Sequence, residues 1–335
     1  MKHVAWIPLL TTGCMLNLDG LMPFFDPLHC SEVTEATCDP DHPDWSEGHD
    51  PDWDRACTPC DEPYDWAEEH PWREATLDGD YTEIRPILDD YVETQRFDDA
   101  SGKELDAYLI YSHGEVPALA DTTIVLNHGR FVGIEHYRPR VRFFHELGYT
   151  VFVWDYRGFG KSEATEAPTL PEMMNDARLA YRHAQSVAPD PEKMIIYGMS
   201  IGGIPAGEMA AKFDACAQMF EAAFNSITAK IETNMALSLP GSFLTTGVAE
   251  NDVKLRDSTT PTLIMHGTID DRIHINESRR LFSAIPDSTP KDLVLIDNAG
   301  HGLGFAGGVP EQGVAAYGTI MLEFLAEHAP ECLSD

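Results

Sequence analysis

The chain has 335 residues, enough for one large domain with an appendage or for two small domains. Its 23 Lys and Arg residues are outnumbered by 56 Asp and Glu residues, and the net charge of −33 makes nucleic acid and anionic membrane surfaces poor partners. The hydrophobic content of 43% is that of an ordinary globular protein.

Residues 1–20 carry the features of an export signal. Lys2 precedes a short apolar run, which is typical of a secretory signal. Cys14 directly follows Gly13, and this resembles a bacterial lipoprotein signal, in which such a cysteine becomes lipidated and N-terminal, although Leu10 lies one place too far from the cysteine. We predict export to a bacterial cell envelope, with membrane attachment by a lipid on Cys14. A secreted protein with its signal cut elsewhere and a plain N-terminal tail are the alternatives.

Residues 21–89 are predicted to form an acidic, cysteine-containing N-terminal appendage. The stretch 31–80 holds seventeen Asp or Glu residues and only two Arg residues. Within it, the run 39–54 has closely spaced carboxylates that could suit calcium, but it lacks the ligand spacing of an EF-hand loop. We therefore interpret this run as a solvated acidic segment.

The cysteines also favour export. If Cys14 carries a lipid, an even number remains for pairing, namely Cys30, Cys38, Cys57, Cys60, Cys216 and Cys332. The Cys57–Cys60 spacing is compatible with zinc, but Cys30 and Cys38 are too far apart for the matching half of such a site. We favour disulfides, which persist in oxidising compartments. Cys216 is either bridged to Cys332 or an isolated buried thiol.

Residues 90–330 alternate between strand and helix patterns. Strands are expected over 104–111, 122–127, 150–155, 194–198, 218–224, 262–266 and 292–296. Helices are expected over 137–147, 172–187, 201–213, 276–285 and 311–328. Apolar strands joined by helices predict an α/β fold with a mostly parallel central sheet and helices on both faces. Ligands of such sheets bind beyond the carboxyl ends of the strands.

Ser200 lies at such a strand end. It follows the apolar residues 194–197 and stands between Gly198 and Gly202, which forms the G-x-S-x-G pattern of a nucleophile elbow. In this turn the strand bends sharply into a helix, and bulky neighbours would collide with the backbone. The helix N-terminus supplies unpaired N–H groups for an oxyanion. Ser200 is therefore the predicted nucleophile.

A serine hydroxyl needs a base to remove its proton. His301 lies on a glycine-rich loop after the last predicted strand, and Asp270 follows the strand before it. The order Ser200, Asp270, His301 is the one expected for this fold. The adjacent Asp271 is the alternative acid. His128, His266, Asp155 and Arg157 also follow strands, and we interpret the two histidines as packed and the other two as loop-bracing.

Four motifs occur in order: NHGR at 127–130, DYRGFGKS at 155–162, GMSIGG at 198–203, and HGTIDD at 266–271 with a later GH. With these motifs, residues 90–328 resemble the α/β-hydrolase superfamily, and most of all its small-lid members related to monoacylglycerol lipases, serine aminopeptidases and acyl-protein thioesterases. The resemblance implies an oxyanion hole formed by the backbone N–H groups of Ile201 and Arg130, with Phe131 as the neighbouring alternative to Arg130. The reaction of this family needs no metal or organic cofactor.

A short lid is expected over about 228–260, where apolar residues could wall an acyl pocket or form an amphipathic helix packed on the sheet. We assign substrate contacts to Phe131, Met199, Met235 and Leu239. The predicted function is cleavage of a small-molecule carboxylic ester or thioester through an acyl-Ser200 intermediate. The alternatives are an amidase or peptidase of the same fold and a non-catalytic, surface-anchored binding protein.

Overall fold

The computed structural model describes Tyr64, Trp66 and residues 86–129, 133–163, 169–226, 249–301 and 313–334. The export signal with Cys14, most of the acidic appendage and most of the lid therefore lie outside the described residues. So do Arg130, Phe131, Met235 and Leu239. Among the described residues, no helix combines the length and the apolar character that crossing a membrane requires.

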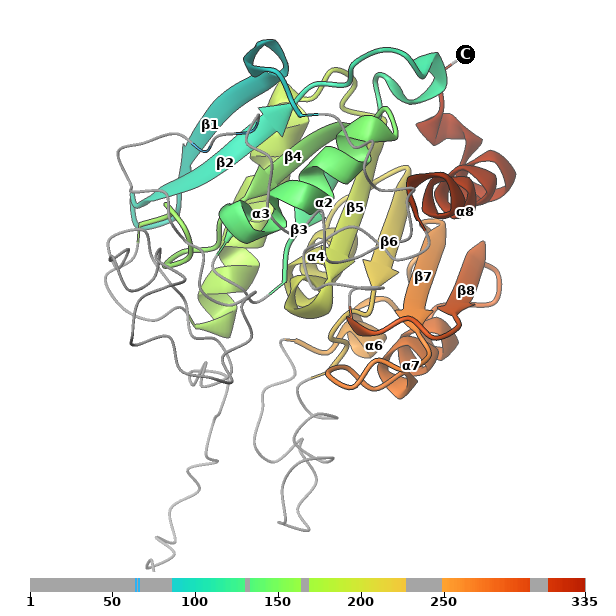
Figure 1. The fold of residues 1–335 in the computed structure, drawn as a ribbon. Coiled ribbons are helices and arrows are strands. Elements are labelled where there is room, and N and C mark those ends of the chain that lie inside the picture. The colour runs from blue at the N-terminus through green and yellow to red at the C-terminus, as the bar shows by residue number, and fades with distance from the viewer. Residues whose placement is uncertain are drawn as a thin grey trace, which may run out of the picture.

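Eight strands form one sheet in the order β1-β2-β4-β3-β5-β6-β7-β8 (Figure 1). Their bounds are β1 Val92–Asp98, β2 Glu104–Ile110, β3 Thr123–Asn127, β4 Thr150–Trp154, β5 Met194–Met199, β6 Ala217–Glu221, β7 Thr262–Gly267 and β8 Lys291–Ile296. The two pairs β1–β2 and β2–β4 are antiparallel, and every other pair is parallel. The predicted mostly parallel sheet is confirmed.

All seven predicted strands are present, and β1 is an additional one. Every residue of the central strands β3, β4, β5 and β6 is buried, and most of these residues are apolar, although Asn127, Gln218 and Glu221 are buried polar exceptions. β1 is an edge strand with the polar sequence VETQRFD and a single buried residue, Gln95. Its hydrogen bonds to β2, not an apolar pattern, define it as a strand.

The main helices are α2 Ile134–Glu146, α3 Leu170–Val187, α4 Gly203–Ala210, α6 Asn251–Lys254, α7 Asn276–Ala284 and α8 Gly313–His328. Short 3₁₀ turns occur at η5 Asp89–Tyr91, η6 Pro117–Leu119, η7 Ser200–Gly202 and η10 Pro330–Cys332. α2 begins three residues earlier than predicted, and α6 was not predicted.

Helices cover both faces of the sheet and create two hydrophobic cores. On β5, Ile195 and Tyr197 pack in the core that includes α2 and α8. The alternate residues Met194 and Ile196 pack in the core that includes α3, α4 and α7. This alternation follows from the two-residue period of a strand and explains why an uninterrupted apolar run is needed there.

Two residues of the predicted appendage pack against the body of the α/β fold. Tyr64 and Trp66 are buried in the same core as α2 and α8. The Trp66 carbonyl accepts hydrogen bonds from Arg142 Nη2 at 2.6 Å and from the Ile87 amide at 3.3 Å. The Tyr64 hydroxyl donates to Asp155 Oδ2 at 3.3 Å. This part of the appendage therefore contributes to the core and contacts the loop after β4.

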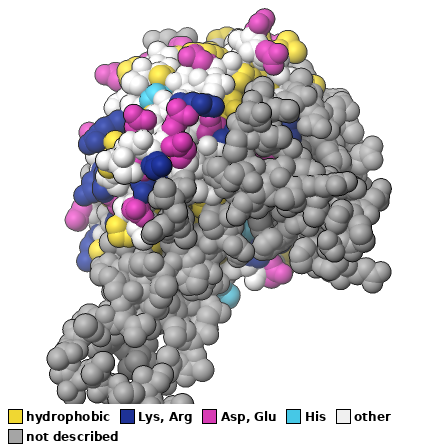
Figure 2. Space-filling model, turned by 90° about the vertical axis from the view of Figure 1, so that its left-hand side faces the viewer, with side chains coloured by type: hydrophobic (Ala, Val, Ile, Leu, Met, Phe, Trp, Pro, Cys, Tyr) yellow, Lys and Arg dark blue, Asp and Glu magenta, His cyan; other side chains and the backbone are white. Residues whose placement is uncertain are grey.

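The described surface mixes charges of both signs. On the face in Figure 2, Lys and Arg side chains lie among Asp and Glu side chains. Seventeen of the 56 acidic residues fall in 31–80, which lies outside the described part of the chain apart from Tyr64 and Trp66. With its two Arg residues this stretch carries a net charge of 2 − 17 = −15 of the total of −33, so its density of negative charge is the highest in the chain, although more than half of the excess lies elsewhere.

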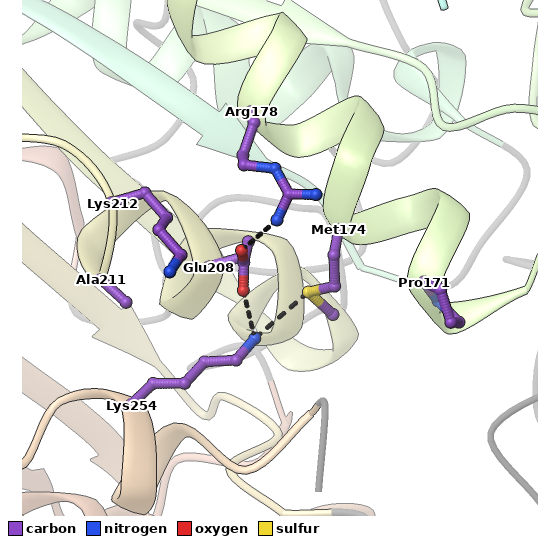
Figure 3. Close-up of a pocket in the computed structure, with 7 residues that line it drawn as sticks. All are labelled: Pro171, Met174, Arg178, Glu208, Ala211, Lys212 and Lys254. Carbon is purple, nitrogen blue, oxygen red and sulfur yellow. Dashed lines mark hydrogen bonds and ion pairs between the residues drawn. The ribbon is translucent and has the colours of Figure 1, made fainter. Parts of the chain in front are cut away.

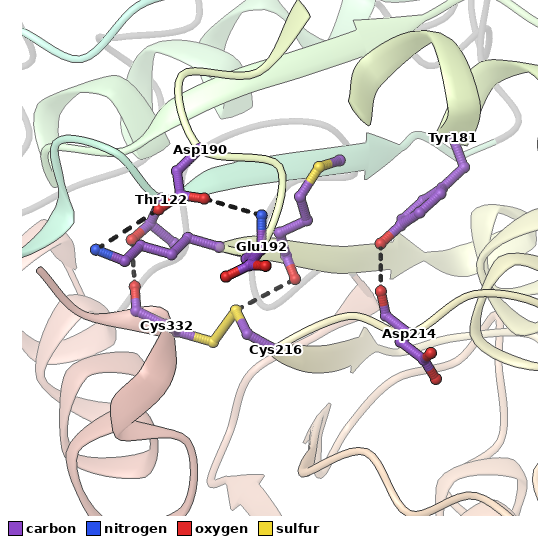
Figure 4. Close-up of a disulfide and its surroundings, with 9 residues drawn as sticks. Thr122, Tyr181, Asp190, Glu192, Asp214, Cys216 and Cys332 are labelled. Atoms are coloured by element: carbon purple, nitrogen blue, oxygen red, sulfur yellow. Dashed lines mark hydrogen bonds and ion pairs between the residues drawn. A yellow bond between two sulfur atoms is a disulfide. The ribbon is translucent and has the colours of Figure 1, made fainter. Parts of the chain in front are cut away.

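Cys216 and Cys332 form a disulfide across 116 residues (Figure 4). Cys216 immediately precedes β6, and Cys332 ends η10, so the bond ties the C-terminal region to the sheet. The Thr122 hydroxyl also donates a hydrogen bond to the Cys332 carbonyl. Of the two alternatives for Cys216, the structure contains the bridged one.

Removing this disulfide is expected to lower the free energy of unfolding by about 4 kcal/mol, because a long loop in the unfolded chain is released. Replacing both Cys216 and Cys332 with alanine leaves no buried hydroxyl in their place. Urea denaturation of this variant should give a lower midpoint than oxidised wild type. Reduced wild type should approach the variant, and equal midpoints for oxidised and reduced wild type would contradict the expectation.

Candidate active site

Ser200 sits where β5 passes through η7 into α4. Its φ of 52° lies in the left-handed region, which is unfavourable for a residue with a side chain. The Ser200 carbonyl accepts a hydrogen bond from the Phe224 amide at 2.6 Å, which links the turn to the segment after β6. The strained conformation is thus held by neighbouring backbone.

The glycines around Ser200 are required by close backbone packing. A Cβ at Gly202 would lie 2.0 Å from the Asn127 carbonyl oxygen, and one at Gly198 would lie 2.5 Å from the Ala206 Cβ. A Cβ at Gly203 would lie 2.8 Å from the Phe224 carbonyl oxygen. The turn therefore fits tightly between the ends of β3 and β6.

The structure brings Ser200, His301 and Asp270 together. The Ser200 Oγ lies 3.0 Å from His301 Nε2, and His301 Nδ1 lies 2.8 Å from Asp270 Oδ2. An ionised carboxylate can only accept, so Nδ1 carries the proton and Nε2 accepts from the serine hydroxyl. Ser200 is 9% exposed and His301 8% exposed, so the contact is largely shielded from water.

Asp270 is held ionised by its surroundings. Its Oδ1 accepts hydrogen bonds from the amides of Arg272 and Ile273, each at 2.9 Å. Burial alone would raise the pKa of Asp270, but the hydrogen bond and charge of His301 together with these amides lower it below its ordinary value. Asp271 is exposed and makes no side-chain hydrogen bond with the residues described.

His266 packs directly behind this carboxylate, with its Nε2 3.4 Å from Asp270 Oδ2. The same nitrogen is 2.9 Å from the Ile273 carbonyl, so it carries a proton, while Nδ1 accepts from the Ser278 hydroxyl at 2.7 Å. Burial lowers the pKa of His266, and the ring is neutral. His266 therefore fixes the Asp270 loop and has no contact with Ser200.

Asp155 braces the start of α2. Its Oδ1 accepts from the Ile134 amide at 2.7 Å, and its Oδ2 accepts from the Lys161 amide at 3.2 Å. A Cβ at Gly133 would lie 2.3 Å from Asp155 Oδ1, so glycine is needed for the backbone to approach. One carboxylate thus joins the start of α2 to the loop after β4.

Arg157 has a similar bracing geometry. Its guanidinium forms a bidentate ion pair with the Asp176 carboxylate on α3, with Nε 2.6 Å from Oδ2 and Nη2 2.7 Å from Oδ1. It also contacts Glu172 at 2.9 Å and Asp99 at 3.0 Å. These ion pairs connect the loop after β4 to α3 and to the β1–β2 hairpin.

The remaining predicted site residues lie as follows. Ile201 follows Ser200 at the start of the helical segment, where amide groups have no partner within a helix. Met199 is 1% exposed and packs in the core that includes α2 and α8. His128 is buried and stacks on Tyr156, with ring centroids 4.1 Å apart.

Tyr137 is a site neighbour that the sequence analysis did not single out. A Cβ at Gly129 would lie 2.2 Å from the Tyr137 hydroxyl and 3.4 Å from the Ser200 Cβ. The phenol therefore reaches across from α2 to the backbone beside the serine. The available signal was its position just after the NHGR motif, at the start of a predicted helix.

Asp106 on β2 makes stability depend on pH. Burial and the charge of Asp155 raise its pKa to about 7, although Arg96 and Lys161 oppose the shift. The folded state therefore binds a proton that the unfolded state releases near pH 4, and stability falls as the pH rises from about 4 to about 7. Asp106→Asn should remove this fall and stabilise the protein at pH 8 by about 2 kcal/mol.

Urea denaturation between pH 5 and pH 8 would measure this effect. The exposed Asp98 on β1 offers a matched control, because Asp98→Asn removes a carboxylate from the same hairpin without the burial. Parallel pH profiles for wild type and Asp106→Asn would contradict the expectation.

Sequence comparisons agree with this geometry. The family model for serine aminopeptidase, S33, matches residues 119–246. The uncharacterized protein YfhR of Escherichia coli (strain K12) is 30% identical over 217 residues, which cover 62% of this chain and 73% of YfhR. Alpha/beta hydrolase domain-containing protein 17B of Homo sapiens is 29% identical over 191 residues, covering 54% of this chain and 61% of the human protein.

Solved structures share the fold. The Pyrococcus furiosus esterase Pf2001 superimposes with a TM-score of 0.54 at 18% identity, over 71% of this chain and 93% of the esterase. A Thermogutta terrifontis esterase with bound butyrate gives a TM-score of 0.53 at 20% identity, over 71% of this chain and 94% of that enzyme. Sheet order, nucleophile-elbow geometry and sequence relatives lead to one conclusion, that this chain belongs to the serine hydrolases of the α/β-hydrolase superfamily.

Proposed function

We propose that this hydrolase cleaves a small-molecule carboxylic ester or thioester through an acyl-Ser200 intermediate. The observation that carries the proposal is the continuous contact from Ser200 Oγ to His301 Nε2, at 3.0 Å, and from His301 Nδ1 to Asp270, at 2.8 Å. This is the arrangement in which a base can activate a serine and be oriented by a carboxylate.

In the acylation step, Ser200 Oγ attacks the carbonyl carbon while His301 Nε2 takes its proton. Asp270 holds the Nδ1 proton and stabilises the imidazolium that forms. The oxyanion accepts hydrogen bonds from the Ile201 amide and from a second amide, that of Arg130 or Phe131. His301 then donates its proton to the leaving alcohol or thiol, and the carbon–oxygen or carbon–sulfur bond breaks. Water, deprotonated by the same imidazole, hydrolyses the acyl-serine.

Ester chemistry is supported by the structural neighbours. The T. terrifontis esterase has been solved with butyrate bound and also phosphorylated by paraoxon. For this chain we propose an acyl group bound beside Ser200, with Phe131, Met199, Met235 and Leu239 as contacts. An amidase is the second candidate, because the matching family model is named for a serine aminopeptidase.

A fluorophosphonate probe tests the proposal directly. We expect covalent labelling of the wild type and none of Ser200→Ala. A p-nitrophenyl ester series from acetate to palmitate, run beside aminoacyl p-nitroanilides, then separates esterase from amidase and ranks chain lengths. Folded wild type that neither reacts with the probe nor turns over any ester would favour a non-catalytic binding protein.

We also propose export to the cell envelope with a lipid on Cys14. The Cys216–Cys332 disulfide supports an oxidising destination, because such bonds persist there. Intact-mass measurement after expression in a bacterium tests both parts. A mass with an uncleaved N-terminus would oppose export, and a cleaved chain without added lipid would indicate secretion instead.

A further inference from the structure

A pocket whose lining does not include Ser200 lies among three helices on one face of the sheet. It has a volume of about 470 Å³ and is lined by Pro171, Met174, Arg178, Glu208, Ala211, Lys212 and Lys254. These residues come from α3, from α4 with its C-terminal end, and from α6 (Figure 3). The pocket is therefore bounded by the helix that begins just after the serine elbow, but it contains none of the residues assigned to catalysis.

The pocket concentrates positive charge in a strongly acidic protein. Glu208 accepts from Arg178 Nη1 at 2.5 Å and pairs with Lys254 Nζ at 2.7 Å. The third cation, Lys212, is exposed and forms no ion pair with the described residues. Three cations and one carboxylate leave about two positive charges at the lining.

Lys254 is the most buried of the three cations. Its side chain is only 14% exposed. Burial lowers its pKa, and the charges of Arg178 and Lys212 add to that effect, whereas Glu208 opposes it. A bound anion would reduce the repulsion among the three cations. Guanidinium and ammonium groups together suit phosphate oxygens, which accept several charge-assisted hydrogen bonds.

We propose that this pocket binds a small organic phosphate monoester. The dianionic phosphate matches the net charge of the lining and would lie against Lys212, Lys254 and Arg178. The apolar wall of Pro171, Met174 and Ala211 would contact the organic part of the ligand. A carboxylate of similar size, with one negative charge, should bind more weakly.

Hydrogen bonds also connect α6, which lines the pocket, to the start of the helix after the serine turn. Asn251, which opens α6, donates from Nδ2 to the Gly203 carbonyl at 2.7 Å and to the Phe224 carbonyl at 3.3 Å. A Cβ at Gly207 would lie 2.0 Å from Asn251 Oδ1, so α4 and α6 are in tight contact. A ligand that bridges Lys254 and Lys212 would therefore strengthen the packing of α6 on the helix that carries the serine turn.

Isothermal titration calorimetry at constant ionic strength tests the proposal, with butyl phosphate and pentanoate as probes. We expect one saturable site for butyl phosphate with a Kd of about 1 mM, and binding of pentanoate weaker by about fivefold or more. Lys212→Gln, at an exposed position, should weaken butyl phosphate about fivefold, and Lys254→Met about tenfold or more. Thermal melts of each variant verify folding.

Lys103→Gln is the matched control, because it removes one lysine charge beside the β1–β2 hairpin, and Lys103 does not line the pocket. It should bind butyl phosphate like wild type. Ser200→Ala should also bind normally, so failure of the hydrolase proposal and failure of this one are distinguishable. No saturable binding, equal binding of pentanoate, or unchanged binding by folded Lys212→Gln and Lys254→Met would overturn the proposal.

Discussion

Ser200→Ala is expected to lower kcat for ester hydrolysis by at least about 10⁴-fold, and His301→Ala should have a loss of similar size. The hydroxyl and the imidazole act as one unit, since Oγ is 3.0 Å from Nε2 and neither group performs the proton transfer alone. The double variant should therefore be no slower than either single variant. Steady-state kinetics with the best p-nitrophenyl ester of the series measures all three.

Folding is separable from chemistry in this experiment. Ser200→Ala keeps the Cβ and the left-handed backbone, so the melting temperature should change by no more than about 2 °C. Ser283 on α7 is exposed and provides the control Ser283→Ala, which should keep full activity. If the two losses of kcat multiplied in the double variant, Ser200 and His301 would not act as one unit. A folded Ser283→Ala enzyme with a low kcat would also contradict the assignment of Ser200 and His301.

Asp270→Asn should lower kcat by about 10⁴-fold, whereas Asp271→Asn should change it by less than about threefold. The amide of asparagine would donate to His301 Nδ1, which favours the tautomer with its proton on Nε2. That nitrogen then faces Ser200 as a donor and cannot serve as the base. The two variants form a matched pair because the carboxylates are adjacent, and only Asp270 is 2.8 Å from His301.

The same kinetic assay distinguishes the two carboxylates. A large loss in Asp271→Asn with an active Asp270→Asn would move the role of the acid to residue 271. The stability of both variants should be measured by unfolding at the assay pH. Asp270 also accepts hydrogen bonds from two amides and lies near His266, so its replacement could affect folding as well as catalysis. A loss of activity that merely follows a loss of folded protein would count against the assignment.

Much of the fold could be predicted from local pattern. The central strands are buried on both sides, so their sequences are mostly apolar, and all seven predicted strands are present. The elbow was also recognisable, because a serine in this turn needs neighbours without a Cβ. Gly198 and Gly202 meet that need, and the distances to Ala206 and Asn127 give the reason.

Other features depend on partners that are distant in the sequence. β1 is a strand because its backbone bonds to β2, while its side chains are mostly polar and exposed. Adjacent carboxylates have nearly the same sequence context, and only the turn after β7 directs Asp270 to His301 and Asp271 to solvent.

The sequence by itself determined the superfamily, the sheet and the serine turn. The order of the four motifs indicates the superfamily, the spacing of apolar residues predicts the strands and helices, and the glycines beside Ser200 predict the turn. Tertiary structure alone decided the bridge between Cys216 and Cys332, the raised pKa of Asp106 beside Asp155, and the cationic pocket around Glu208. Each of these joins elements that are separated along the chain. A disulfide forms only between cysteines that are close in space, and the Coulomb interaction between two charges depends on the distance between them. Only the folded chain sets these distances.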